Sequence, residues 1–289
     1  MLDDVFQNII NKYINRENKK IYYLYFSIFK FLTKSKFILQ FKDYKFYASF
    51  NKKSLSRWML KNLKAWDSKN VEKVIYFVKK YNGSFIDCGC NFGAYSIPIA
   101  KEFKNQNIYA FDASRKAIFN LEQNINLNKI YNINYFNIGI GDKNTEMYFN
   151  EDVDDLKNDG SFRFTKNKKN KKIKIFKLDD VFKNEKIYLN ENIIIKLDLE
   201  GFDFLALKGL IDTLKKSKVI IFIEISKMLL SNSNNFSNEF DLFIKNNALN
   251  IYDLNLKTKN VDQIIKSLNT IDIKKETVDD YIISNHKLL

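Results

Sequence analysis

The segment Ser84-Phe-Ile-Asp-Cys-Gly-Cys-Asn-Phe-Gly93 constrains the fold more than any other part of the chain. A strand-like apolar run ends on an acid, Asp87, and Gly89, Asn91 and Gly93 follow before a helical pattern begins. This order is typical of a buried parallel strand that passes through a tight turn into a helix. In open α/β sheets, ligands bind outside the carboxyl ends of such strands. We therefore expect a nucleotide-like cofactor to lie against this turn.

The alternation of strand and helix repeats along the chain. Strands are predicted at residues 85–89, 107–112, 132–140, 192–198, 219–225, 249–254 and 279–284, and helices at 92–104, 114–128, 202–216 and 236–247. The runs Ile193–Ile195 and Val219–Ile223 are apolar without alternation, which is typical of parallel strands covered on both faces. The sequence therefore predicts an α/β fold, with a doubly wound, mostly parallel sheet and helices on both faces.

The first 69 residues are predicted to form an N-terminal extension to a domain that spans 70–289. Residues 37–50 alternate like a hairpin. Residues 54–81, which continue past the end of the extension, have helical spacing. Residues 21–32 are densely apolar, with lysines on both sides. We interpret them as a helix packed on the domain; the alternative is an interfacial helix that contacts a membrane surface or a partner.

The amino-acid composition limits which cellular compartment and which classes of binding partner we expect. A formal charge of +14 suggests acidic partners, but the chain is rich in Lys, Asn, Ile, Phe and Tyr throughout, which indicates a global coding bias. Nucleic acid is therefore disfavoured as a partner. Cys88 and Cys90, the only cysteines, are too close for a normal disulfide and too few for a zinc site, so we expect a reducing, cytoplasmic compartment. Neither a secretory signal nor a transmembrane segment is predicted.

The turn after the first of these strands discriminates between two cofactors. A dinucleotide fingerprint needs Gly-x-Gly-x-x-Gly, and Asn91 and Ala94 stand where its second and third glycines would be. Asp87 would also face the pyrophosphate unfavourably. S-adenosylmethionine has no phosphate, its amino group suits a carboxylate, and its ribose diol suits an acid such as Asp112 at the end of the next strand. The turn therefore favours S-adenosylmethionine, and a glycine turn without a ligand remains the structural alternative.

Several segments resemble, in order, those of the FkbM-type S-adenosylmethionine-dependent methyltransferases. They are Phe85–Gly93, Tyr109–Asp112, Leu121–Asn128, Asn137–Asp142, Lys177–Asp180, Ile195–Asp203 with Leu207–Gly209, and Ile223–Glu224. The resemblance implies the Rossmann-like class I methyltransferase fold, with seven strands of which the last is antiparallel. It also implies methyl transfer to a sugar hydroxyl of a glycan or secondary metabolite. The alternative, motivated by charge, is a nucleic-acid methyltransferase or a basic nucleic-acid-binding protein.

The same resemblance implies which residues hold the cofactor. The residues are Asp87, Gly89, Asn91, Gly93, Asp112, Ala113, Gly139, Asp142 and Asp198. Asp112-Ala113 stands where the family usually has Glu-Pro, which shortens the acid expected at the ribose.

Three acids are candidates for catalysis because they follow predicted strand ends. Asp198 is the expected general base for a hydroxyl acceptor, with Glu200 and Glu224 beside it. An alternative is a divalent cation held by these acids and Asp203; the sequence favours the metal-free mechanism. For Glu200, the structural alternative is an acid at a helix N-terminus. The lysine-rich run 166–177 is interpreted as a solvated hairpin loop, with contact to an anionic acceptor as the alternative.

Overall fold

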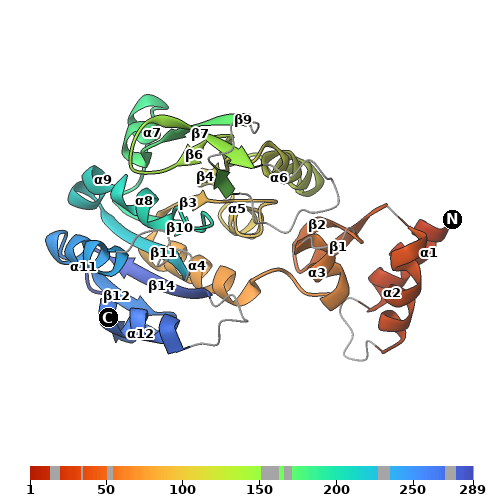
Figure 1. Cartoon of the computed structure of the whole chain (residues 1–289). Helices are drawn as coiled ribbons and strands as arrows, with labels where there is room; N and C mark the ends of the chain where they lie inside the picture. The colour runs from red at the N-terminus through yellow and green to blue at the C-terminus, as the bar shows by residue number, and fades with distance from the viewer. Residues whose placement is uncertain are drawn as a thin grey trace.

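The computed structural model describes residues 1–13, 20–33, 35–50, 55–150, 163–165, 171–226, 235–270 and 278–288. Figure 1 shows an N-terminal group of elements beside a larger α/β body. The N-terminal group consists of α1 (Leu2–Tyr13), α2 (Lys20–Leu32), β1 (Lys36–Phe41), β2 (Tyr44–Ser49) and α3 (Leu55–Asn62). The division of the chain at residue 69 stays a prediction.

The body is built on an eight-stranded sheet in the order β13-β12-β14-β11-β10-β3-β4-β5. Its strands are β3 (Ser84–Cys88), β4 (Ile108–Phe111), β5 (Ile133–Phe136), β10 (Asn192–Leu197), β11 (Lys218–Ser226), β12 (Asn250–Asp253), β13 (Thr258–Lys259) and β14 (Val278–Ser284). The five neighbouring strands β5, β4, β3, β10 and β11 pair in parallel. β14 runs antiparallel between β11 and β12. The predicted mostly parallel sheet with an antiparallel last strand is confirmed, and β13 adds a short edge strand that the pattern does not predict.

The central strands are apolar because helices cover both faces of the sheet. Ile194 packs in one buried cluster with side chains of α4, α5 and α6, whereas Ile193 and Ile195 pack in another with side chains of α7, α8, α9, α11 and α12. These helices are α4 (Ser68–Tyr81), α5 (Ser96–Glu102), α6 (Arg115–Asn128), α7 (Leu178–Asn184), α8 (Asp203–Lys208), α9 (Ile211–Lys216), α11 (Phe236–Asn246) and α12 (Val261–Thr270). The prediction of helices on both faces is confirmed.

A second, four-stranded sheet corrects the prediction of one strand over residues 132–140. β5 ends at Phe136, and β6 (Gly139–Ile140) pairs with β9 (Lys171–Phe176) in the order β6-β9-β7-β8, with β7 (Thr145–Asn150) and β8 (Arg163–Thr165). The Asn137 side chain explains the break, because its Nδ2 donates to the carbonyl oxygens of Asp112 and Ala113, each at 3.0 Å. The lysine-rich run lies partly outside the described residues, at 166–170.

Two predicted helices are each divided in two. The helix expected at 54–81 is broken between α3 and α4, where Leu63 and Asp67 adopt left-handed backbone conformations with φ of 49° and 47°. The helix expected at 202–216 is broken at Gly209, whose backbone passes so close to the Gly141 carbonyl oxygen that a Cβ would lie 2.2 Å from it. Both single-helix predictions are wrong, since tertiary contacts override a continuous apolar pattern.

The N-terminal group is attached to the body through β2. Asn128 on α6 accepts the backbone N–H of Lys45 at 2.7 Å and donates to its carbonyl oxygen at 2.7 Å. Asn124, one turn earlier, accepts the N–H of Tyr47 at 3.0 Å. The predicted hairpin is confirmed, and residues 21–32 do form a helix, but α2 packs on the other N-terminal elements rather than on the domain (Figure 1). Among the described residues, no helix is long and apolar enough to cross a membrane.

Candidate functional site

Gly89 lies where the turn after β3 packs against the turn after β10. Its φ is 82°, and a Cβ at this position would lie 1.8 Å from the carbonyl oxygen of Asp198. The backbone N–H of Asp198 in turn donates to the carbonyl oxygen of Cys88 at 3.1 Å. The glycine is therefore required by the approach of one strand end to another. The tight turn predicted from the sequence is confirmed, and its close neighbour is the Asp198 segment.

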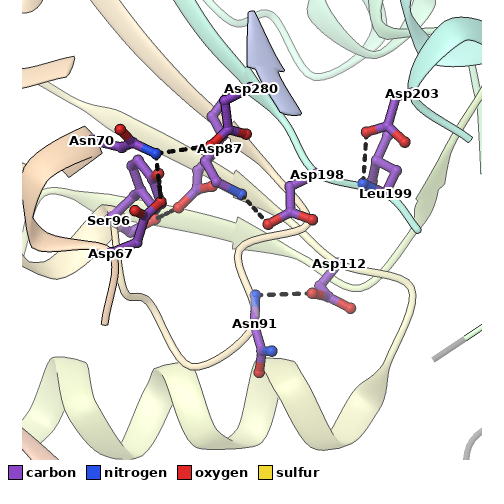
Figure 2. Close-up of polar contacts among 12 residues, drawn as sticks. Asp67, Asn70, Asp87, Asn91, Ser96, Asp112, Asp198, Leu199, Asp203 and Asp280 are labelled. Carbon is purple, nitrogen blue, oxygen red and sulfur yellow. Dashed lines mark hydrogen bonds and ion pairs between the residues drawn. The ribbon is translucent and has the colours of Figure 1, made fainter. Parts of the chain in front are cut away.

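Asp112 holds the same turn from the end of β4. Its Oδ2 accepts the backbone N–H of Asn91 at 2.9 Å, and its Oδ1 accepts the N–H of Ser114 at 2.8 Å. Burial raises the pKa of Asp112 to about 6, although these two hydrogen bonds act in the opposite direction. Figure 2 shows the Asn91 side chain pointing away from Asp112. Asn91 thus contacts Asp112 through its backbone N–H rather than through its side-chain amide.

Asp87 is buried beneath the turn. Its Oδ2 accepts the hydroxyl of Ser96 at 2.6 Å, and its Oδ1 has no hydrogen-bond partner among the described residues. Burial raises the pKa of Asp87, while the charge of Lys196 on the neighbouring strand opposes that rise. A buried carboxyl group with one unpaired oxygen is costly unless a donor reaches it.

Lys196 lies at the centre of the candidate site, although the sequence motifs assign it no role. Its Nζ lies 2.8 Å from Oδ2 of Asp198 and 4.8 Å from the ring centroid of Tyr95. Burial alone would lower the pKa of Lys196, but the carboxylates of Asp198 and Asp87 outweigh it and raise that pKa. The signal was present: a lysine within the apolar run of β10 would be expensive to bury without anionic partners.

A cavity of about 490 Å³ opens beside this lysine. Its lining includes Asp198 and Glu224, as predicted, together with both tryptophans of the chain, Trp58 and Trp66. Glu200 is not part of the lining. The cavity therefore lies against the ends of β10 and β11, where two of the three catalytic candidates meet.

Two further acids of this cavity were missed. Asp67 precedes α4 and Asp280 lies on β14, and Nδ2 of Asn70 donates to both, at 3.2 and 2.8 Å. The Tyr95 hydroxyl also donates to Asp67. Burial raises the pKa of Asp67 and brings the pKa of Asp280 to about 6. Figure 2 shows this hydrogen-bonded group on one side of Asp198 and the Asp112 turn on another.

Asp203 and Glu200 shape the turn after Asp198. Asp203 is buried, and its two oxygens accept the backbone N–H groups of Leu199 at 2.8 Å and Gly201 at 3.1 Å. Glu200 has a left-handed backbone with φ of 51°. Among the described residues, no group of three or more His, Cys, Asp or Glu side chains could hold a metal ion.

The remaining predicted cofactor residues lie near the turn after β3 or at the start of the second sheet. The Ala113 carbonyl accepts Nδ2 of Asn137, as described above. Gly93 has a φ of 90°, and a Cβ there would collide with the side chains of Leu121 and Ile97. Gly139 begins β6, and Asp142 follows it. The structure therefore brings Asp87, Asp112 and Asp198 together, whereas Gly139 lies in β6 of the second sheet and Asp142 lies just after it.

Replacing Glu224 with glutamine is expected to stabilise the protein at high pH. Burial, with the charges of Asp198 and Asp203, raises the pKa of Glu224 from 4.5 to about 9. The folded state therefore binds this proton more tightly than the unfolded state, and the stabilisation is complete below pH 4.5 and lost as pH rises through about 9. In urea titrations, E224Q should gain about 1–3 kcal/mol over the native protein at pH 9 and almost nothing at pH 5. The exposed Glu185→Gln should change little at either pH, and an equal gain for E224Q at both would contradict the assignment.

Comparison with known proteins places the chain in a family. A family model described as "Methyltransferase FkbM domain" matches residues 87–252, more than half of the chain. Comparison with curated proteins gives no significant match.

Three solved structures illustrate the structural likenesses. The M. jannaschii TYW2 protein in complex with AdoMet is 14% identical over 87% of this chain and 86% of that chain, with a TM-score of 0.41. The magnesium protoporphyrin IX methyltransferase of Synechocystis PCC 6803 with bound SAM is 11% identical over 81% and 92%, with a TM-score of 0.40. The tRNA (uracil-54, C5)-methyltransferase of Pyrococcus abyssi with S-adenosyl-L-homocysteine is 12% identical over 87% and 44%, with a TM-score of 0.39. These likenesses are partial and assign no acceptor. The family match over residues 87–252 shows that the chain belongs to the FkbM-type family of S-adenosylmethionine-dependent methyltransferases.

Proposed function

We propose that this methyltransferase methylates a sugar hydroxyl of a glycan or secondary metabolite, with Asp198 as the general base. The observation that carries the proposal is the cavity of about 490 Å³ beside Asp198, which combines aromatic walls with carboxyl groups. A sugar presents apolar C–H faces to aromatic rings and hydroxyl donors to carboxyl oxygens. Trp58 and Trp66 meet edge to face here, with ring centroids 5.1 Å apart.

The residues at the strand ends fit the chemistry of S-adenosylmethionine. The unpaired Oδ1 of Asp87 is an acceptor suited to a cationic amino group. Each oxygen of Asp112 accepts one backbone N–H and keeps a lone pair for a ribose hydroxyl. Asp87, Gly89, Asn91, Gly93, Asp112, Ala113 and Asp198 are the proposed holders, with Gly139 and Asp142 as further candidates. The cofactor supplies a sulfonium methyl group, which moves to the acceptor oxygen by in-line displacement.

Asp198 is suited to remove the proton of the acceptor hydroxyl. Lys196 contacts its Oδ2 at 2.8 Å, which leaves Oδ1 for the acceptor. The Asp198 side chain is 38% exposed and lines the cavity, so an acceptor can reach it. Glu224, which is protonated at neutral pH because of its raised pKa, can donate a hydrogen bond that positions the acceptor. A catalytic role for Glu200 stays a prediction.

Two observations bear on the alternatives. The cavity lining combines four carboxyl groups, those of Asp67, Asp198, Glu224 and Asp280, with Lys64, Lys69 and Lys196, so it is not the uniformly basic surface that a phosphate backbone requires. This disfavours the nucleic-acid alternative, for which RNA or DNA affinity should fall steeply with salt. Asp203 is only 1% exposed and is not part of the cavity lining, which supports a metal-free mechanism over a cation held with Asp203.

Asp198→Asn is expected to lower methyl transfer about 100-fold, the usual scale for removing a positioned base. The measurement is transfer from labelled S-adenosylmethionine to a panel of glycans, with and without chelator. The circular dichroism spectrum should persist in the variant. Because Asp198 is also one of the proposed cofactor holders, cofactor binding, measured by calorimetry, should survive but fall by much less than the methyl-transfer rate. The exposed Asp212→Asn is the matched control and should keep full activity. Full activity of D198N would reassign the base to Glu200 or Glu224.

A further inference from the structure

Helix α2 is apolar on two sides, and the described part of the protein covers only one of them. Tyr22, Phe26 and Phe29 are buried against the N-terminal core, where Phe6 of α1 stacks on Phe29 with ring centroids 5.0 Å apart. The opposite side, here called the α2 outer face, consists of Ile21, Leu24, Ile28, Phe31 and Leu32. Leu24 is 62% exposed and Phe31 is 79% exposed. This spacing of three, four, three and one places the five side chains along one stripe of the helix.

The α2 outer face belongs to the densest group of exposed apolar side chains in the described part of the chain. Of 17 exposed large apolar residues there, nine lie within the first 32 positions. The start of α1 adds Leu2 and Val5, and it is tied to the end of α2 because the Ser35 hydroxyl donates to Asp3. Single exposed apolar residues need no explanation, whereas a grouped patch marks an interaction surface.

Among the described residues of α1 and α2, the charges around this face are mainly basic. Helix α2 contains no acid, begins with Lys20 and carries Lys30 in its last turn, and α1 ends near Lys12. The two acids of α1 are already engaged: Asp4 pairs with the N-terminal amino group at 2.8 Å, and Asp3 accepts from Ser35. An apolar stripe with lysines at its ends is the composition of a helix that lies in the plane of a membrane interface.

We propose that the α2 outer face binds anionic lipid bilayers. With its axis parallel to the surface, α2 would insert Leu24, Ile28 and Phe31 between headgroups while Lys20 and Lys30 contact lipid phosphates. A bilayer fits better than a second copy of this chain, because a second α2 would bring further lysines and no acid to pair with them. This inference is independent of the acceptor proposed above.

The test is co-sedimentation of the full chain with vesicles of phosphatidylcholine alone or mixed with phosphatidylglycerol. The native protein should bind the mixed vesicles, less so at high salt, and should bind phosphatidylcholine weakly. The double variant Leu24→Glu/Phe31→Glu should lose binding by about tenfold or more per substitution, the equivalent of burying one such side chain. The control Tyr188→Glu/Leu242→Glu changes the charge equally at exposed apolar positions outside this face and should bind like the native protein.

Three outcomes would overturn the proposal. One is failure of the native protein to bind the mixed vesicles. Another is an equal loss in both double variants, which would make net charge the cause. The third is a native dimer in solution that Leu24→Glu/Phe31→Glu converts to a monomer, which would identify a second copy as the occupant. Because all substituted residues are exposed, both variants should fold, and circular dichroism verifies that they do.

Discussion

Lys196→Met is expected to lower the free energy of unfolding by about 3–5 kcal/mol, the usual cost of removing one partner from a buried ion pair. The Lys196 side chain is only 7% exposed, and it compensates the charges of Asp198 and Asp87 from the middle of the sheet. Methionine has a similar length and fills the same space. The loss of unfolding free energy therefore measures the missing positive charge rather than a cavity left by a shorter side chain. Urea unfolding of the purified protein measures it.

Two further variants separate the buried charge from lysine loss in general. Lys218 pairs with Glu191 at 3.2 Å, with side chains 57% and 73% exposed, so Lys218→Met should cost about 0–1 kcal/mol. Adding Asp87→Asn and Asp198→Asn to Lys196→Met removes the orphaned charges and should restore part of the stability. Equal effects of K196M and K218M would show that the buried charges are compensated in some other way.

Gly89→Ala is expected to cost about 2–5 kcal/mol of stability, from left-handed backbone strain combined with overpacking. The φ of 82° disfavours any side chain, and the added Cβ would lie 1.8 Å from a backbone oxygen, which cannot rotate away. Relief requires the turns after β3 and β10 to separate. Because Asp87 and Asp198 flank these turns, affinity for S-adenosylmethionine should also fall, as calorimetry would show.

Gly141→Ala is the matched substitution. A Cβ at Gly141 would meet only Cγ2 of Ile175, at 2.9 Å, and that side chain can adjust. We expect a loss of about 1 kcal/mol with cofactor affinity unchanged. If G89A were no worse than G141A, the close approach of the two turns would not be a requirement of the fold.

The parts of the site that sequence could predict are those at strand ends. Parallel strands end at one edge of a sheet, so Asp87, Asp112 and Asp198 could be placed together from the apolar runs before them. Asp67 and Asp280 could not be placed there from the sequence. They are joined by Asn70, which lies 210 positions before Asp280. No local pattern encodes a contact between a helix start and the last strand.

The parts of the fold that sequence missed depend on contacts between distant segments. The helix break at Gly209 lies against the Gly141 carbonyl oxygen, and the Asn137 side chain, just past the end of β5, donates to the carbonyl oxygen of Asp112. The buried helices and strands, in contrast, can be predicted from the spacing of apolar residues. Each of them needs only one apolar side that packs against the core. Lys196 shows the limit of such rules, since its position predicts a charged partner without naming it.

The position of β14 has a consequence for how this protein is made. β14 pairs with β11 on one side and β12 on the other, yet residues 278–284 are the last strand of this sheet to be synthesised. Until then, β11 and β12 each present an unpaired edge to other nascent chains. The family match ends at residue 252, before β14, so a gene fragment cut to the match would encode a sheet that stays open. Expression trials should therefore keep the C-terminal segment, and its synthesis marks the moment when the sheet closes.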